Sequence, residues 1–188
     1  MIRVPFSGLL LSEIAAHLKR GGLIAYPTES CYGLGCDPRN RAAVRRLLVL
    51  KGRTQRKGLI LIASRPAQLL PYLKPLDATA QTALRRDGAQ AVTYLMPAKA
   101  GCPRWLRGEF DTLAVRVTAH PLAAGLCTGL NMALVSTSAN RSGQPPARTA
   151  VQCRRLFGNA VRVIPGKIGK RKKPSTIRDW ASGRIVRS

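Results

Sequence analysis

Short apolar runs alternate with amphipathic segments along the chain. Residues 59–63 form a continuous apolar run with β-branched members, which is typical of a buried strand, and the run 23–26 predicts a second one. Residues 112–117 alternate apolar and polar side chains, which predicts a strand with one face on a core. Further strands are predicted at 91–96, 133–136 and 161–164, with a final hairpin over 175–180 and 184–187.

Helices are predicted where apolar residues recur one turn apart between capping signals. Residues 12–20 have Ser12 as a potential N-cap, and the pair Gly21-Gly22 ends them. Residues 40–50 start at Asn40, another favourable N-cap. Other helical segments are expected at 66–73, 78–86, 121–128 and 150–157.

The interleaving of these elements indicates the fold class, α/β or α+β with a mixed sheet. The 188 residues contain no evident linker or repeat, so one domain over residues 1–188 is expected. No apolar run approaches the length of a membrane span. The N-terminal segment is too short and too quickly acidic for a secretory signal, so we expect a cytoplasmic location.

The stretch 25–35, Ala25-Tyr-Pro-Thr-Glu-Ser-Cys-Tyr-Gly-Leu-Gly35, is expected to begin in the strand 23–26 and to continue as a loop. Pro27 lacks an N–H and is expected to end the ladder. Thr28, Glu29 and Ser30 would then lie where open α/β sheets bind ligands. Glu29, the only acid in the loop, is expected to be structural and to accept backbone N–H groups.

The charge of the chain changes this picture most. Lys and Arg total 32 against 8 Asp and Glu, which gives a formal net charge of +24. Such an excess indicates a polyanionic partner, nucleic acid or nucleotide phosphates, whereas the alternative is a charge that only aids solubility. The five cysteines are scattered without a CxxC pair, and there are two histidines, so neither a disulfide framework nor a metal site is predicted.

Three groups of polar residues are candidates for chemistry. Lys51 and Arg53 follow a predicted helix and suit a triphosphate, although a solvated basic loop is the alternative. The polar stretch 136–140 can bind phosphate, ribose or an amino-acid carboxylate, or it can be an ordinary capped turn. Arg116 ends an apolar strand, where it either meets an anion or lies at the sheet edge. His17 and His120 are expected on a helix surface and in a turn, without catalytic roles.

Five short sequence motifs occur along the chain, and their order is informative. They are Tyr26-Pro-Thr-Glu-Ser-Cys-Tyr-Gly-Leu-Gly-Cys-Asp37, Lys51-Gly-Arg53, Leu113-Ala-Val-Arg-Val117 with His120-Pro121, Ser138-Ala-Asn140 with Ser142-Gly143, and Pro174-Ser-Thr-Ile177. In this order they resemble the YrdC/TsaC family of L-threonylcarbamoyladenylate synthases over nearly the whole chain. The chain departs from the family at Ser30, where Thr is usual, at Thr54, where Pro is common, and at 88–93, where relatives carry a PGPxT block.

The resemblance implies a fold and a reaction. The implied fold is a YrdC-like twisted mixed sheet, with helices around a large basic cavity. The implied reaction converts L-threonine, bicarbonate (or CO2) and ATP into threonylcarbamoyl-AMP and pyrophosphate. ATP is then a substrate accompanied by Mg²⁺, and the adenylate passes to proteins that modify tRNA. The basic surface is expected to contact tRNA or another RNA.

The resemblance also implies roles for individual residues. The residues expected to bind L-threonine are Ser30, Arg116, Ser138 and Ser175. The residues expected to bind ATP are Lys51, Arg53, Lys57, Thr112, Asn140 and Arg187. Lys51, Arg53, Ser138 and Asn140 are expected to form the catalytic group.

Two other functions compete with the synthase. One is an RNA-binding or ribosome-maturation factor that keeps the fold and uses its charge to hold RNA. The other, less favoured, is a carbamoyl-transfer module of the kind embedded in hydrogenase maturation proteins, which are much larger chains.

Overall fold

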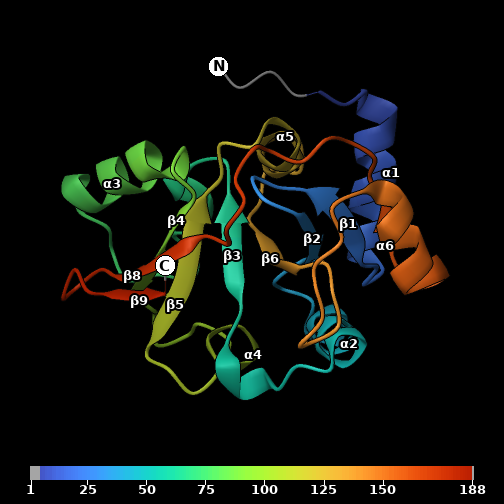
Figure 1. Ribbon diagram of the computed structural model, residues 1–188. Helices are drawn as coiled ribbons and strands as arrows, with labels where there is room; N and C mark the ends of the chain where they lie inside the picture. Colours follow the sequence, from blue (N-terminus) through green and yellow to red (C-terminus); the bar gives the residue numbers. More distant parts are fainter. Residues whose placement is uncertain (1–4, 188) are drawn as a thin grey trace.

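The centre of the molecule is a nine-stranded mixed sheet with the strand order β7-β1-β2-β6-β3-β5-β4-β8-β9 (Figure 1). A computed structural model describes residues 5–187, so the outermost ends of the expected domain, residues 1–4 and 188, lie outside the described residues. The strands are β1 (Ile24–Pro27), β2 (Tyr32–Gly35), β3 (Ile60–Ala63), β4 (Val92–Pro97), β5 (Thr112–Val117), β6 (Leu134–Ser138), β7 (Arg162–Val163), β8 (Thr176–Asp179) and β9 (Ile185–Arg187). The helices are α1 (Gly8–Lys19), α2 (Arg41–Lys51), α3 (Ala78–Gly88), α4 (Arg104–Arg107), α5 (Pro121–Gly129) and α6 (Ala150–Phe157), with 3-10 turns η1 (Gln55–Lys57), η2 (Pro66–Gln68) and η3 (Gly158–Ala160).

Strand β6 joins the two halves of the sheet. It runs antiparallel to β2, with Ser138 opposite Gly33, and antiparallel to β3 on its other side. β3 and β5 are parallel neighbours, with Ile62 opposite Arg116. Parallel and antiparallel pairs therefore occur in one sheet, which confirms the predicted fold class.

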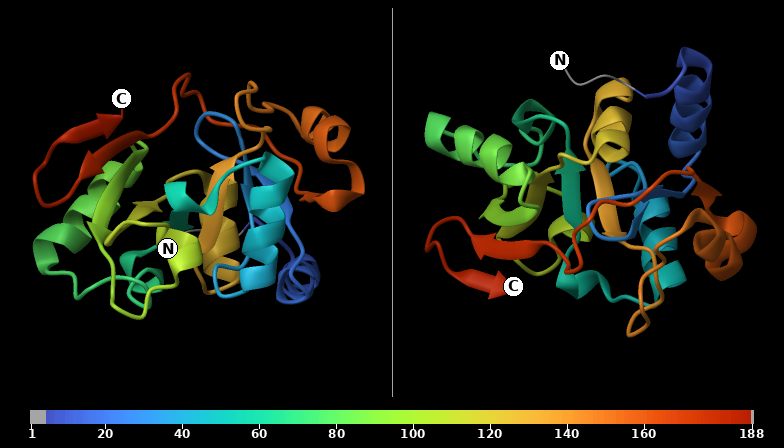
Figure 2. Two further views of the ribbon diagram at one scale, coloured as in Figure 1. Left: turned by 90° about the horizontal axis from the view of Figure 1, so that it is seen from below. Right: turned by 45° about the horizontal axis from the view of Figure 1, so that its top comes forward.

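Helices cover both faces of the sheet (Figures 1 and 2). On one face, α1 and α5 pack on β1, β3 and β6 around a fully buried cluster that includes Ile62 and Leu134. Ile60 and Ser136 lie two residues away on the same strands, and they line a cavity instead. One half of this face is therefore core, and the other half is available to a ligand.

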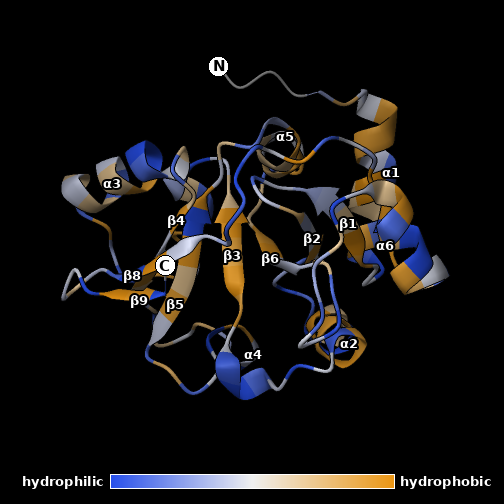
Figure 3. Cartoon of the chain, viewed as in Figure 1, coloured by the Kyte–Doolittle hydropathy of each residue, from blue (hydrophilic) through white to orange (hydrophobic). Residues whose placement is uncertain are grey.

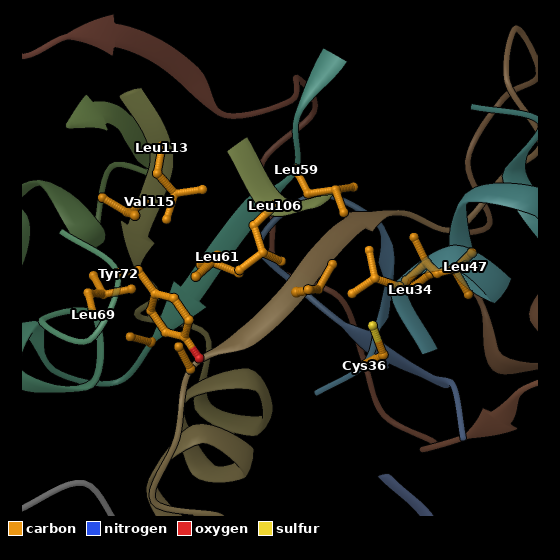
Figure 4. Close-up of a cluster of buried hydrophobic side chains, with 14 of the residues drawn as sticks. Leu34, Cys36, Leu47, Leu59, Leu61, Leu69, Tyr72, Leu106, Leu113 and Val115 are labelled. Carbon is orange, nitrogen blue, oxygen red and sulfur yellow. The ribbon is translucent and has the colours of Figure 1, made fainter. Parts of the chain in front are cut away.

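The larger core cluster lies on the opposite face, under α2, α3 and α4. Leu34, Leu61 and Val115 project from strands β2, β3 and β5, and Leu47 and Leu106 project from helices to meet them (Figure 4). All five are fully buried, and Figure 3 shows the matching hydrophobic colour of β3 at the centre of the sheet. Burial of apolar surface on this scale is the main force that holds the sheet in place, so the cavity on its other face has a rigid floor.

The prediction that 28–35 forms a loop is wrong, because β1 and β2 form a β-hairpin there. Pro27 does not end the ladder but pairs with Tyr32. Its missing N–H is tolerated because β7, the neighbour on the other side of β1, pairs only with Ile24 and Ala25. The backbone N–H and the hydroxyl of Thr28 both donate to Cys31 O, at 3.0 and 2.7 Å, and close the turn.

Other element boundaries also differ from prediction, and three of these differences have a clear physical reason. α1 starts at Gly8, because Ser7 rather than Ser12 is the N-cap and accepts from the Leu10 N–H at 3.3 Å. The helix expected at 66–73 is only the 3-10 turn η2, since Pro71 cannot continue a helix. β6 extends to Ser138 because its last two residues pair with β2. The helix at 150–157 and the strand at 112–117 are confirmed at both ends.

Within residues 5–187, no helix combines the length and apolar character that a membrane crossing requires.

Candidate active site

A cavity of about 330 Å³ lies over β2, β3, β5 and β6. Its walls are the turn 28–31, the loop 140–148 and residues 165–175, a basic segment that we call the strap. Figure 1 shows the strap crossing in front of β3 on its way to β8. The cationic lining residues are Arg53, Arg116, Arg148, Lys172 and Arg187. The hydroxyl and amide lining residues include Ser30, Ser136, Thr137, Ser138, Asn140 and Ser175.

Lys51 ends α2 and holds the loop that carries Ser138 and Asn140. Its Nζ donates to Ser138 O at 2.6 Å, to Asn140 O at 2.9 Å and to Asn140 Oδ1 at 2.7 Å. The Ser138 hydroxyl donates to the same Oδ1 at 2.7 Å. Burial, with a smaller contribution from the neighbouring Arg53 charge, lowers the pKa of Lys51 to about 8. The ammonium thus has acceptors for all three donors within the protein, and Lys51 lies just outside the cavity lining.

Arg53 reaches the cavity because the helix before it ends in a left-handed residue. Gly52 adopts φ +60° and reverses the chain after α2. An Nη atom of Arg53 donates to Gly58 O at 3.0 Å, but its Nε is buried with no hydrogen-bond partner among the described residues. Burial lowers the pKa of Arg53. A half-buried guanidinium whose buried Nε still has a free N–H is suited to an anionic oxygen.

Arg116 lies on β5 and is 8% exposed. An Nη atom lies 3.3 Å from Glu29 Oε2, and its buried Nε has no partner among the described residues. Glu29 Oε1 also accepts from the Thr118 hydroxyl at 2.6 Å. Burial alone would raise the pKa of Glu29, but Arg116 and Thr118 outweigh it and hold the pKa below its usual value. The carboxylate of Glu29 was expected to accept backbone N–H groups, but its partners are the side chains of Arg116 and Thr118.

Ser175 and Arg187 close the cavity on the side of the C-terminal hairpin. Ser175 is buried, and its Oγ accepts from the Thr93 hydroxyl at 2.9 Å. Arg187 donates to Ser175 O at 2.9 Å and to Ser175 Oγ at 3.2 Å. Partial burial, together with the nearby charges of Arg116 and Arg53, lowers the pKa of Arg187. The three guanidinium groups therefore repel one another, which favours an anion between them.

Ser30 stands at the tip of the β1–β2 turn and lines the cavity beside Cys31. Its Oγ lies 3.8 Å from Cys31 Sγ, and Arg148 Nη1 donates to Ser30 O at 3.1 Å. Burial raises the pKa of Cys31, so its thiol stays protonated at neutral pH.

Eight of the ten predicted site residues are brought together in or against the cavity, and two lie outside it. Lys57 is exposed in η1, and Thr112 starts β5 on the same strand face as Arg116, but neither is among the lining residues. The sequence reasoning missed Arg148 and Lys172, which line the cavity. Only the basic character of the strap pointed toward Lys172, and no local signal separated Arg148 from the other cations of the chain.

The two histidines lie outside the cavity lining. His17 is half-buried, and its Nε2 lies 3.0 Å from Leu23 O, so it is not simply a helix-surface residue. His120 caps α5, and its Nε2 lies 3.0 Å from Lys167 O in the strap. No cluster of three metal-ligating side chains occurs within residues 5–187.

The cavity is therefore rich in cations, hydroxyls and one amide, and none of its lining residues is acidic or a histidine. Such a set suits reactions in which positioning and charge stabilisation carry most of the rate, as in attack on a nucleotide phosphate. It does not suit acid–base chemistry by a carboxylate pair.

The comparison with known proteins identifies the family. The sequence profile of the Sua5/YciO/YrdC family, described as "Telomere recombination", matches residues 16–188. The chain belongs to this family, as the five motifs indicated. It is 57% identical over 173 residues to a protein of Thiobacillus denitrificans named threonylcarbamoyl-AMP synthase, covering 92% of each chain. It is 55% identical over 177 residues to a protein of the same name from Nitrosococcus oceani, covering 93% of this chain and 96% of that one.

Solved structures show the same fold. The crystal structure of P. abyssi Sua5 complexed with L-threonine matches with a TM-score of 0.85 and 29% identity. The match covers 96% of this chain and 53% of that one, so the present chain spans about half of its length. E. coli YciO matches with a TM-score of 0.81 and 23% identity, covering 97% of this chain and 90% of that one, which supports the fold alone.

Proposed function

We propose that this protein is an L-threonylcarbamoyladenylate synthase. It is a nucleotidyltransferase that forms threonylcarbamoyl-AMP and pyrophosphate from L-threonine, bicarbonate (or CO2) and ATP, for threonylcarbamoyladenosine modification of tRNA. The observation that carries this proposal is the acid-free cavity lined by Arg53, Arg116 and Arg187, in a chain 57% identical to a named threonylcarbamoyl-AMP synthase. The relatives do not favour the alternative of an RNA-binding factor without synthase activity.

The proposed roles follow the chemistry of each side chain. Arg53 and Arg187 bind the nucleotide phosphates, because guanidinium forks match phosphate oxygens. Arg116 binds the threonine carboxylate, and the hydroxyls of Ser30 and Ser175 orient the amino acid. These assignments are supported by the position of all five residues around one cavity.

Residues near the loop 136–140 complete the proposed site. Asn140 and Ser138 meet the nucleotide and threonine respectively, and Lys51 holds both in place through the contacts described above. Lys57 and Thr112 are proposed as outer contacts of the nucleotide.

The remaining components are also proposals. Mg²⁺ enters with ATP rather than through a dedicated protein site, since phosphates supply the oxygen ligands that this ion prefers. The adenylate passes to proteins that modify tRNA, and the reaction takes place in the cytoplasm, where these substrates meet.

The direct test is incubation of the protein with ATP, L-threonine and labelled bicarbonate. We expect pyrophosphate release that depends on threonine, together with a labelled adenylate. If no labelled product forms while RNA binds tightly at moderate salt, the synthase proposal is wrong and the RNA-binding alternative stands.

RNA contact is tested separately by titrating salt. A surface that binds phosphates through the +24 charge predicts a steep fall of RNA affinity with ionic strength. A flat salt response would refute electrostatic RNA contact and leave the synthase proposal untouched.

A further inference from the structure

Glu29 connects three segments that each carry a residue proposed to bind threonine. Its backbone lies in the turn that carries Ser30, and its carboxylate meets Arg116 of β5. The backbone carbonyl of Glu29 accepts from the Arg171 N–H of the strap at 3.0 Å, four residues before Ser175. The preceding carbonyl, Thr28 O, accepts from the Gly169 N–H at 2.9 Å.

The fit between Glu29 and the strap is close. A Cβ atom on Gly169 would lie 2.6 Å from Glu29 O and 2.9 Å from Glu29 Cα, so only glycine allows this approach. The strap and the turn are therefore held at one fixed separation, and the carboxylate of Glu29 is aimed at β5.

The carboxylate engages only one side of Arg116. An Nη atom of the guanidinium lies 3.3 Å from Oε2 as an ion pair, but neither Oε2 nor the guanidinium Nε has a hydrogen-bond partner among the described residues. Oε1 is held separately by the Thr118 hydroxyl. Glu29 itself is not a lining residue of the cavity, so it does not touch a ligand there.

We propose that Glu29 is a positioning residue for threonine: it orients the Arg116 guanidinium and fixes its distance to Ser30 and Ser175. This inference rests on the proposed function. A negative charge beside Arg116 has two opposing effects on a bound carboxylate. It weakens attraction by partial neutralisation, and it strengthens binding by keeping a buried, five-donor group in one orientation. We infer that orientation dominates, because a guanidinium that is 8% exposed has few other acceptors to hold it.

The test is Glu29→Gln, which keeps the shape and removes the charge. We expect the threonine KM to rise about tenfold or more, since small misplacements in a binding site cost rates of this order. The ATP KM should change less than about twofold, because Arg53 and Arg187 do not contact Glu29. Glu29→Asp, which keeps the charge, should recover part of the threonine affinity.

The chain offers a matched control and a second variant. Glu13 forms an ion pair with Arg162 at 2.6 Å on the surface, and Glu13→Gln should leave both KM values unchanged. Thr118→Val removes the hydroxyl that holds Oε1 and that also accepts from the His120 N–H at 3.3 Å, and we expect a smaller rise in the threonine KM. This variant tests the inference even if Glu29→Gln fails to fold.

The outcomes separate the inference from the proposed function. Unchanged or tighter threonine binding in folded Glu29→Gln, or in Thr118→Val if Glu29→Gln does not fold, would overturn the inference alone. Equal rises in the threonine and ATP KM values would also overturn it, because they indicate general disruption. A wild-type protein that neither binds threonine nor forms the adenylate would overturn the proposed function and this inference with it.

Discussion

Two cationic regions at the cavity are built in opposite ways. One is the Lys51 region, and the other is the arginine region, which consists of Arg53, Arg116 and Arg187. Lys51 is buried, and its three donors are already bound to oxygens of Ser138 and Asn140. Arg116 is also buried and Arg53 is half-buried, but each keeps a buried Nε without a partner among the described residues. Arg187 stands beside them and shares their mutual repulsion. A cation whose N–H donors are all bonded within the protein stabilises the structure. A cation with an unbonded donor can bind a ligand.

The two cations of the motif Lys51-Gly-Arg53 therefore have different roles. Lys51 and Arg53 are two residues apart in sequence, yet they face different tasks because Gly52 reverses the chain between them. We expect substitutions in the arginine region to remove ligand affinity directly. Substitutions in the Lys51 region should act through the loop 136–140.

The largest effect is expected from Arg53→Ala. Loss of a half-buried guanidinium that meets phosphate should lower kcat/KM for ATP on the order of 100-fold, with the fold intact. The matched control is Arg56→Ala, since the Arg56 side chain is 80% exposed and forms an ion pair with exposed Glu109. Steady-state pyrophosphate release measures both variants. Wild-type rates in Arg53→Ala would refute its assignment.

Asn140→Ala should have the next largest effect. It removes the Oδ1 that accepts from both Lys51 and Ser138, so the loop loses its internal anchor. We expect kcat/KM to fall roughly 10- to 100-fold, as for other hydrogen bonds to a charged group. Asn159→Ala, on the exposed turn η3, is the control, and equal activity in the two variants would contradict the anchoring role.

The third prediction concerns pH. Three acceptors around Lys51 Nζ require three N–H donors, which only the charged ammonium supplies. Because burial lowers the pKa of Lys51 to about 8, activity should fall about tenfold per pH unit above that value.

The contribution of Lys51 to the free energy of unfolding should instead increase as the pH rises above this pKa. The unfolded chain binds more protons between the lowered pKa and the ordinary one, so this contribution rises with pH in that window. Activity that stays constant to pH 10 in a folded protein would contradict the requirement for the ammonium.

Gly169→Ala, a substitution in the strap, should lower activity less than the changes above. The new Cβ would meet the backbone of Glu29 at 2.6 Å, so the strap must shift and carry Ser175 with it. We expect kcat/KM for threonine to fall about fivefold. Gly101→Ala is the control, because nothing lies within 4 Å of its added Cβ. Equal kinetics of the two alanine variants would show that the close approach has no functional role.

Lys57→Ala should have the smallest effect. Lys57 is exposed in η1 and lies outside the cavity lining, so its proposed outer contact with the nucleotide is solvated and screened by salt. We expect less than a twofold change in the ATP KM at physiological salt. A change as large as that of Arg53→Ala would place Lys57 in the arginine region.

The sequence carried the fold class and most of the site, for identifiable reasons. Helix α6 and strand β5 were predictable to the residue because capping and alternation signals coincide with their ends. Strand β2 was missed because its two glycines and the preceding proline resemble a loop, and only pairing with β1 and β6 makes it a strand. Long-range pairing of this kind leaves no local pattern.

The same limit applies within the site. The motifs Lys51-Gly-Arg53 and Ser138-Ala-Asn140 were recognisable, but the bonds between them span about half of the chain. These tertiary contacts decide which cation has all its N–H donors bonded within the protein and which keeps a donor for a ligand. Arg148 was missed because its place beside Ser30 depends on how the loop 140–148 folds back onto the hairpin.

The proposed difference between the Lys51 region and the arginine region is tested most directly by a crystal structure with L-threonine and a non-hydrolysable ATP analogue bound. We predict that Arg53 and Arg187 contact phosphate oxygens and that Arg116 contacts the threonine carboxylate. Lys51 Nζ should remain bonded to Ser138 and Asn140. A structure in which Lys51 leaves these oxygens to bind phosphate, while Arg53 and Arg116 stay without ligand contacts, would contradict the account.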